Sequence, residues 1–332
     1  MNQIINLKDE ERRILFRNTA QKLMMHEAIV EKDFWVCFML DYLFHQCKWK
    51  KHFIFKGGTS LSKCYHLIHR FSEDIDLILD WRMIGYEKDE PWLVRSNTQQ
   101  EKFNKMAYKK SKVFLHNELL PILKSDITKL LNRNADFYID NDDAQTICFN
   151  YPRIFSDDSI LQMIRLEIGI FAAWTPANIK TIKPFVAECY PHVFKKSSTD
   201  IMTVSVERTF WEKVTILHHE ANRPQHLMMP KRYSRHYYDL YCMAHSNMKE
   251  NLLNDLDMLD KVVSFKMKFY PRKWAKYEEV KLGAIRLVPP AYRLELLKKD
   301  YLSMQEMIYG EYPSFEKLIE YIMELEQEIH FR

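Results

Sequence analysis

The stretch "FKGGTSLSKCYHLIHRFSEDIDLIL", residues 55–79, combines a glycine pair with two acidic residues inside an apolar run. The segment "HFIFKGG" (52–58) is a short β-rich run that ends in a turn, and the pattern after it predicts a helix over 59–68. Thr59 or Ser60 is the expected N-cap of that helix. Only 6 of the 332 residues are glycine, so the pair Gly57-Gly58 indicates a particular backbone requirement at this turn.

The segment "DIDLILD" (74–80) predicts a strand that carries acidic residues on one face. Side chains alternate along a strand, so Asp74 and Asp76 point the same way while Ile75, Leu77 and Leu79 point the other way into a core. Two carboxylates ~7 Å apart repel each other unless a cation lies between them. This spacing therefore predicts bound Mg²⁺, with two ions arranged for in-line displacement at phosphorus; a solvated surface strand is the alternative.

The turn before the helix fits the same chemistry. A strand–Gly-Gly-Thr/Ser–helix connection lets backbone N–H groups approach a phosphate, and the helix N-terminus adds its positive dipole end. We therefore predict nucleotide binding by Gly57, Gly58, Thr59 and Ser60, with Lys63 one turn further contacting phosphate. A tight turn without a ligand is the alternative. No G-x-x-x-x-G-K-[ST] motif is present, which excludes a P-loop.

A third carboxylate is predicted from strand faces. In the expected strand "ILQMIRLEIGIF" (160–171), Ile164, Leu166 and Ile168 share one face, and Arg165 and Glu167 share the other. A neighbouring strand that placed Glu167 on the same side as Asp74 and Asp76 would complete a set of metal ligands. An exposed ion pair between Arg165 and Glu167 is the alternative.

Bulk composition indicates a globular protein with two domains. The chain is 47% hydrophobic and 28% charged, and it contains no apolar run of the ~18 residues that a membrane-spanning helix needs. The N-terminus does not resemble a signal peptide, and the six cysteines form no C-x-x-C pair, so we expect a cytoplasmic protein with reduced thiols. Expected strands cluster before about residue 185, which predicts an α+β lobe over 1–185 and a helical lobe over 186–332.

The net charge is only +4, but basic residues gather in two stretches. Residues 102–133 hold eight Lys or Arg against two acidic residues, and residues 261–299 hold eleven against three. The second stretch also carries six aromatic residues between Phe265 and Tyr292. Such residues can neutralise phosphates and stack on bases, which predicts an RNA partner. Solvated helix faces with buried aromatics are the alternative.

Four sequence blocks carry a resemblance to a known family. They are "KGGTSLSK", "RFSEDIDL", "ERTFWEKVTILHHE" with a central lysine, and "SRHYYDLY", which has the form Arg-x-x-x-Asp. The upstream "VEKDFWV" (30–36) also resembles the family's N-terminal helix. In this order, the blocks resemble the AbiEii/AbiGii nucleotidyltransferase toxins, which lie within the DNA-polymerase-β-like superfamily.

The resemblance implies a polymerase-β-like palm in the first lobe and a helical second lobe. It implies transfer of a nucleoside monophosphate from an NTP, with Mg²⁺, to an RNA acceptor, for which the tRNA 3′ end is expected. It further implies a toxin paired with an antitoxin protein in a toxin–antitoxin or phage-defence system of the abortive-infection type.

The same resemblance implies roles for three residues of the second lobe. Lys213 and Asp239 become catalytic, with Lys213 as a cation on the triphosphate and Asp239 orienting Lys213 or contacting the nucleotide; Arg235 becomes nucleotide-binding. The residues alone favour simpler interpretations. Lys213 could pair with Glu212 or Glu220, and Arg235 with Asp239 has the spacing of an ion pair within one helix.

Two other classes of protein remain open from the sequence. A small-molecule nucleotidyltransferase of the antibiotic-modifying type would use the same palm, but it has no need for the basic aromatic stretches. A non-catalytic nucleotide-binding partner protein would keep the glycines and lose the metal chemistry, which the intact D-x-D disfavours.

Overall fold

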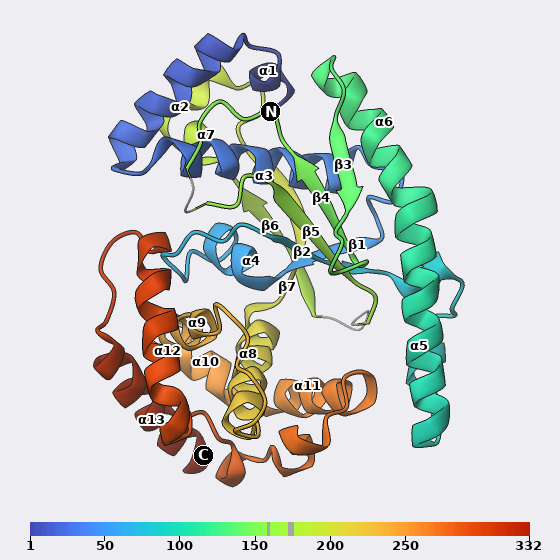
Figure 1. Cartoon of the computed structure of the whole chain (residues 1–332), viewed down its shortest axis with the longest axis vertical. Helices are drawn as coiled ribbons and strands as arrows, with labels where there is room; N and C mark the ends of the chain where they lie inside the picture. Colours follow the sequence, from blue (N-terminus) through green and yellow to red (C-terminus); the bar gives the residue numbers. More distant parts are fainter. Residues whose placement is uncertain (158–159, 172–175) are drawn as a thin grey trace. The chain divides into compact units, whose positions relative to one another are not determined.

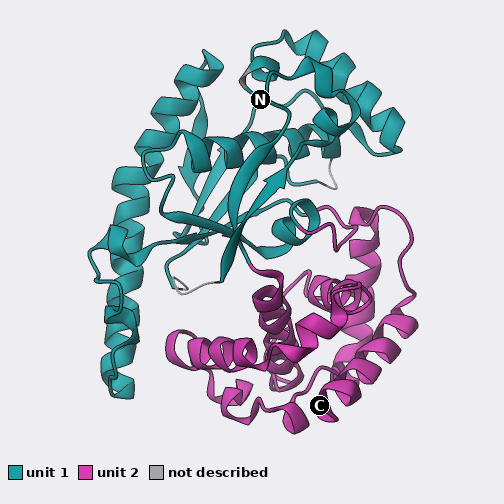
Figure 2. Ribbon diagram, turned by 180° about the vertical axis from the view of Figure 1, so that it is seen from behind, with its two compact units in different colours: residues 1–64, 72–204 teal, residues 65–71, 205–332 magenta. Residues whose placement is uncertain are grey.

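The computed structural model describes residues 1–157, 160–171 and 176–332. The chain forms two compact units, shown in Figure 2: residues 1–64 with 72–204, and residues 65–71 with 205–332. The division at 204/205 differs from the expected 185/186 because strand β7 (Thr199–Val204) pairs with β1 (Phe53–Lys56) and so belongs to the first unit. The second unit also takes in a short piece of chain, residues 65–71, from the opening stretch.

A seven-stranded mixed sheet with the order β3-β4-β5-β2-β1-β7-β6 forms the centre of the first unit. Strand β2 lies antiparallel to β1 and parallel to β5, so the two predicted acidic strands are neighbours. This sheet, followed by a helical unit, confirms the predicted α+β class. Besides β1 and β7, the strands are β2 (Ile75–Leu79), β3 (Asp136–Ile139), β4 (Thr146–Asn150), β5 (Ile164–Gly169) and β6 (Ala177–Ile182).

Helix α3 (Glu27–His45) is the central helix of the first unit. It packs against β5 and β7 on one side and against α2 (Asp9–Leu23) and α7 (Phe185–Cys189) on the other, which explains why nearly all of its residues are buried. Figure 1 shows α3 crossing the strands. Met24, whose φ is 53°, ends α2, and His26 then caps α3. The short α1 (Asn2–Ile5) precedes α2.

The first basic stretch, residues 102–133, lies mostly in one long helical run. Helix α5 (Asn97–Phe114) passes through a π-helical turn (Leu115–Leu119) into α6 (Leu120–Leu131), and α6 packs on β3. Ser96 and Gln99 form a capping box that starts the run, and Asn132 ends it with a φ of 50°. Two 3₁₀ turns (Trp81–Ile84 and Glu90–Trp92) occupy the predicted loop before α5.

The second unit is helical. Helix α8 (Val206–Ala221) packs against α9 (Ser234–Ala244), and residues 65–71 join the unit through a β-bridge between Arg70 and Ile308. None of the helices in the described ranges is long and apolar enough to cross a membrane. The remaining α-helices are α10 (Lys249–Asn254), α11 (Leu256–Phe269), α12 (Ala291–Met304) and α13 (Phe315–His330), with 3₁₀ turns at Lys273–Ala275, Tyr277–Glu279, Leu282–Ala284 and Gln305–Met307.

Candidate functional site

Gly57 is the residue on which the opening turn depends. Its φ is +83°, a conformation that L-residues with a side chain rarely adopt. A Cβ atom at this position would lie 1.9 Å from Oδ2 of Asp76, so only glycine leaves room for that carboxylate. Gly57 and Asp76 of the D-x-D motif are therefore in direct contact.

Helix α4 (Gly57–Lys63) begins and ends earlier than predicted, and Lys56 rather than Thr59 or Ser60 is its N-cap. Both hydroxyls instead donate to backbone carbonyls: Thr59 Oγ1 to the oxygen of Asp74 at 2.6 Å, and Ser60 Oγ to that of Gly57 at 2.7 Å. The predicted capping role is therefore wrong. The Thr59 bond ties the start of α4 to the residue that opens the D-x-D motif.

The predicted acidic residues come together on the sheet. Asp76 and Glu167 are register partners on the parallel strands β2 and β5, so their side chains leave the sheet on the same face. Asp74 directly precedes β2, and its Oδ1 lies 3.9 Å from Nε of Arg165, which is on the same strand face as Glu167. The pairing of β2 with β5 meets the condition set from the sequence, that a neighbouring strand place Glu167 on the same side as the D-x-D motif.

Arg165 lies among these acidic residues. Its guanidinium is hydrogen-bonded to Asp140, and its Nε lies 3.9 Å from Asp74 Oδ1 and 3.5 Å from Glu167 Oε1. The backbone N–H of Asp142 and the Arg165 guanidinium lower the pKa of Asp140. Asp140, which follows β3, was not predicted, because only the pairing of β3, β4 and β5 brings it near Arg165.

The donor types of this group suit a hard divalent cation, since all are carboxylate oxygens. The Arg165 guanidinium already lies beside Asp74 and Glu167 and partly neutralises their charge. Within the described ranges, no three His, Cys, Asp or Glu side chains converge as the ligands of one ion would. The carboxylates therefore match a divalent cation in donor type, and Asp76 and Glu167 leave the sheet on one face.

Lys63, predicted to contact phosphate, is buried. Its Nζ forms an ion pair with Asp33 Oδ1 at 2.7 Å and lies 4.1 Å from the centre of the Phe185 ring. Burial opposes the ammonium charge, but the pairing with Asp33 raises the pKa of Lys63. A contact between Lys63 and phosphate would require this ion pair to break, so the structure favours a role in holding α4 against α3.

Three consecutive buried residues of α3 explain the upstream block "VEKDFWV". Glu31 accepts hydrogen bonds from the backbone of residues 154 and 155, and Lys32 donates to Glu73 Oε2 at 2.7 Å. Asp33 accepts from the backbone N–H of residue 185 as well as from Lys63. Because Glu73 adjoins Asp74 and Lys63 lies in α4, this block braces both halves of the opening stretch.

The second unit contains its own buried charged cluster. Lys213 Nζ donates to Asp239 Oδ2 at 2.6 Å and lies 3.1 Å from His236 Nδ1. Arg70 holds the same carboxylate through two bonds, Nε to Oδ1 at 2.7 Å and Nη2 to Oδ2 at 2.9 Å. The resemblance implied that Asp239 orients Lys213 or contacts the nucleotide, and the bond between the two side chains is compatible with the first of these roles.

The simpler pairings considered for this cluster are not formed. Glu212 pairs with Arg208, and Glu220 pairs with Arg223, so neither holds Lys213. The carboxylate of Asp239, four residues after Arg235, is bonded to Arg70 and Lys213 instead. Each of these three carboxylates therefore pairs with a cation other than the one considered from the sequence.

Burial and charge shift the pKa values of the cluster. Burial raises the cost of ionising Asp239, but the Arg70 and Lys213 cations overcome it and lower the pKa of Asp239. Burial and the repulsion from Arg70 lower the pKa of Lys213 despite the nearby Asp239. Burial and Lys213 lower the pKa of His236 well below its usual value, so His236 is neutral and can accept a hydrogen bond.

The two basic stretches differ once they are folded. In residues 102–133, every Lys and Arg except Lys110 is exposed. Four of these cations, Lys102, Lys105, Lys109 and Lys112, recur on one face of α5. In residues 261–299, the side chains of Phe265, Phe269 and Tyr277 are buried, and Trp274 stacks on His219 with ring centres 4.3 Å apart. Those aromatics belong to packing, while Tyr270 and Tyr292 remain exposed.

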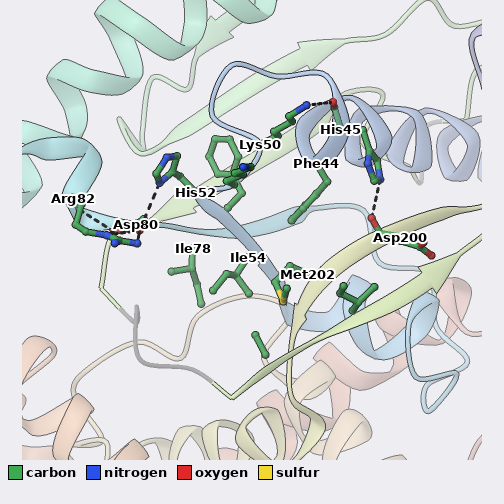
Figure 3. Close-up of a pocket in the computed structure, with 14 residues that line it drawn as sticks. Phe44, His45, Lys50, His52, Ile54, Ile78, Asp80, Arg82, Asp200 and Met202 are labelled. Atoms are coloured by element: carbon green, nitrogen blue, oxygen red, sulfur yellow. Dashed lines mark hydrogen bonds and ion pairs between the residues drawn. The ribbon is translucent and has the colours of Figure 1, made fainter. Parts of the chain in front are cut away.

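A hollow of about 580 Å³ opens at the N-terminal end of β1 (Figure 3). Ile54 and Ile78, register partners on β1 and β2, lie in its wall two residues from Lys56 and Asp76, so the hollow and the carboxylate share a sheet face. Its volume is in the range of small-molecule sites. The other lining residues are Phe44, His45, Lys50, Lys51, His52, Phe53, Asp80, Arg82, Ala177, Ile179, Asp200 and Met202.

Comparison with known proteins identifies the family. The family model described as "Nucleotidyl transferase AbiEii toxin, Type IV TA system" matches residues 41–321. Among solved structures, the chain is similar to MenT4, a nucleotidyltransferase toxin of Mycobacterium tuberculosis H37Rv, with 12% identity, a TM-score of 0.47, and coverage of 95% of this chain and 98% of that one. No curated protein matches the chain. The chain belongs to the AbiEii family of nucleotidyltransferase toxins of type IV toxin–antitoxin systems.

Proposed function

We propose that this nucleotidyltransferase toxin transfers a nucleoside monophosphate from an NTP to the 3′ end of an RNA, with tRNA as the expected acceptor. The observation that carries the proposal is the placement of Asp76 and Glu167 side by side on one face of the sheet, with Gly57 directly against Asp76. That arrangement joins a close backbone approach for phosphate to a set of acidic ligands for metal.

Asp74, Asp76 and Glu167 would hold Mg²⁺, with two ions expected. Bound there, Mg²⁺ polarises the phosphoryl oxygens and activates the attacking hydroxyl. Arg165 lowers the mutual repulsion of these carboxylates, and its bond to Asp140 keeps the guanidinium at the edge of the group.

The turn at the start of α4 supplies the phosphate contacts. Gly57 and Gly58 bring backbone close to the carboxylates, and Thr59 and Ser60 fix that backbone through their bonds to the carbonyls of residues 74 and 57. Lys63 supports the turn from behind through Asp33, in place of the direct phosphate contact expected from the sequence.

Lys213 provides the second source of positive charge for the polyphosphate. An ammonium has three N–H donors, and Asp239 and His236 are its two hydrogen-bond partners in the described part of the chain, which leaves one donor for a ligand. Arg235 would add a further cation.

The RNA acceptor is supported by the cationic face of α5. Lys102 and Lys112 are ten residues apart, so the four exposed lysines cover roughly 15 Å of helix. A row of cations at this spacing suits the regularly spaced phosphates of a nucleic-acid strand. Membership of a type IV toxin–antitoxin family likewise supports a cognate antitoxin as partner, action in the cytoplasm and a role in phage defence.

The proposal is tested by incubating the protein with each α-³²P-labelled NTP, total RNA and Mg²⁺, with the Asp76→Ala variant as control. Labelled RNA that appears only with the unaltered protein and Mg²⁺ supports the proposal. Label transferred only to an added small molecule would indicate the antibiotic-type enzyme. Absence of any transfer would favour a non-catalytic nucleotide-binding protein.

A further inference from the structure

Arg70 grips Asp239 with the geometry of a bidentate arginine–carboxylate pair. Both side-chain oxygens of Asp239 accept from it, at 2.7 and 2.9 Å, and only 5% of Arg70 is exposed. The fork-to-fork contact fixes the plane of the carboxylate as well as its position. Oδ2, one of the two oxygens held in this way, is the atom that receives the Lys213 ammonium.

The backbone around Arg70 is held as firmly as its side chain. Arg70 forms a β-bridge with Ile308, the N–H of Phe71 donates to the carbonyl of Met307 at 2.7 Å, and the N–H of Tyr309 donates to that of His69 at 2.8 Å. Residues on both sides of Arg70 are thus pinned within the second unit. A guanidinium anchored in this manner can set the direction of another side chain.

The charges of the cluster do not balance. Arg70 and Lys213 are cations and Asp239 is the anion that both contact, which leaves one excess positive charge beside a neutral His236. Buried charge without a partner is costly, so a cluster with one cation for Asp239 would favour stability more than this cluster with two. The excess charge instead suits an anion such as the polyphosphate of an NTP.

We propose that Arg70 is a positioning residue for nucleotidyl transfer: its grip on Asp239 aims the free N–H of Lys213 and keeps Asp239 from neutralising Lys213 fully. The inference rests on the proposed function of Lys213 and adds a residue to it. Without Arg70, Lys213 would be the sole cation bonded to Asp239 in this cluster. The ammonium would then turn toward the carboxylate and away from the nucleotide.

The kinetic test compares Arg70→Met and Arg70→Lys with Arg293→Met. Arg293 is an equally buried arginine of the second unit that donates to backbone carbonyls of residues 224–227, so its loss reports the effect of removing a buried arginine that does not contact Asp239. Arg70→Met is expected to lower kcat by about 10²-fold with little change in KM for NTP, because a misaimed group costs roughly that much. Arg70→Lys keeps the charge without the fork and is expected to fall between Met and the unaltered protein.

The second readout does not depend on activity. The folded variants are acetylated at a series of pH values, and mass spectrometry of the peptide that contains Lys213 follows the modification of that residue. Its pH dependence reports the pKa of the Lys213 ammonium. Arg70→Met is expected to raise the Lys213 pKa and slow its acetylation at a given pH, since a repelling cation is gone and Asp239 is left to Lys213. Arg293→Met is expected to change neither.

The proposal is overturned if Arg70→Met keeps kcat within threefold of the unaltered protein, or if its loss of activity matches that of Arg293→Met at equal loss of melting temperature. An unchanged Lys213 acetylation profile in both Arg70 variants would also overturn it. Failure of the proposed function looks different. An unaltered protein without transferase activity would refute the function, while the acetylation profiles would still show whether Arg70 controls Lys213.

Discussion

Gly57 and Asp76 are in such close contact that a single added Cβ atom would lie 1.9 Å from a carboxylate oxygen. The two residues are 19 positions apart in the sequence, and the antiparallel pairing of β1 with β2 brings them together, since Lys56 is the register partner of Asp76. The glycine pair and the acidic pair of the opening stretch are thus two parts of one local structure. The Asp76 carboxylate occupies the space that a side chain at residue 57 would need, and glycine leaves that space open.

Gly57→Ala is expected to abolish transferase activity because the new methyl group displaces Asp76. Gly310→Ala is a matched control: Gly310 has a φ of +86° and nothing within 4 Å of its would-be Cβ. Both variants carry the backbone penalty of about 1–2 kcal/mol for a left-handed L-residue, but only Gly57→Ala adds a clash. Denaturant unfolding and the RNA-labelling assay separate the two effects. Equal activity in both variants would refute the contact as a functional constraint.

Asp74→Ala and Asp76→Ala should each remove transfer while leaving the fold intact, because each deletes a metal ligand and also relieves repulsion between neighbouring carboxylates. Glu167→Gln keeps the shape of the side chain and should also reduce activity strongly if Glu167 is a ligand. Initial rates across a Mg²⁺ series measure the effect. A rate above about a tenth of the unaltered value in either aspartate variant would contradict the two-ion assignment.

The sequence could predict which side chains share a face of one strand, but it could not predict which strands lie next to each other in the sheet. Strict alternation placed Asp74 and Asp76 on one face of β2 and Arg165 with Glu167 on one face of β5. Nothing local states that β2 and β5 are adjacent, because parallel pairing joins segments separated by a long crossover. The match of Asp76 with Glu167 therefore became visible only in the folded chain.

The ion-pair partners of the buried cations could not be predicted from the sequence either. Lys63 finds Asp33 and Arg70 finds Asp239, at separations of 30 and 169 residues, and no periodicity encodes either pair. The sequence blocks did contain the missed residues, since Arg70 begins "RFSEDIDL" and His236 lies within "SRHYYDLY". The available signal was a basic residue within a family block.

Lys63→Met distinguishes the structural role of Lys63 from the phosphate contact expected from the sequence. Removing the ammonium leaves Asp33 buried without its cation, which is expected to cost about 3–5 kcal/mol of unfolding free energy. The double variant Lys63→Met with Asp33→Asn should recover much of that loss. Urea unfolding of the unaltered protein and of these two variants tests this. Undiminished stability together with a raised KM for NTP would restore the phosphate role.

Glu31 should make stability fall as pH rises. Burial raises the pKa of Glu31 to about 7, from a usual value of 4.5. Between pH 4.5 and about 7 the folded state keeps its proton while the unfolded state has lost it, so the folded state binds more protons and unfolding becomes easier as pH increases. The full effect is on the order of 3 kcal/mol.

Glu31→Gln should remove this component, because the amide cannot ionise and still offers one acceptor to the backbone of residues 154–155. The measurement is the difference in unfolding free energy between the unaltered protein and the variant at intervals from pH 4 to pH 8. A difference that stays constant across this range would show that Glu31 titrates normally in the folded state.

Lys213 offers the sharpest test of the second unit. If its ammonium stabilises charge that develops on the leaving pyrophosphate, Lys213→Ala and Lys213→Met should both lower turnover by ~10²–10³-fold, as the loss of one preorganised donor does. Methionine keeps most of the alkyl stem, so a packing role predicts that it restores activity while alanine lowers thermal stability. Turnover and melting temperature, measured on both variants, separate these outcomes.

Asp239→Asn then asks whether Lys213 and Asp239 act together. The 2.6 Å bond between them predicts strong coupling, so the double variant should be little slower than either single variant. Multiplication of the two rate losses would instead show independent roles. Because Asp239 also balances Arg70, Asp239→Asn leaves two buried cations without an anion and should lower the melting temperature more than Lys213→Met does. Normal turnover in Lys213→Met would remove the second unit from the chemistry and leave it to the carboxylates beside Gly57.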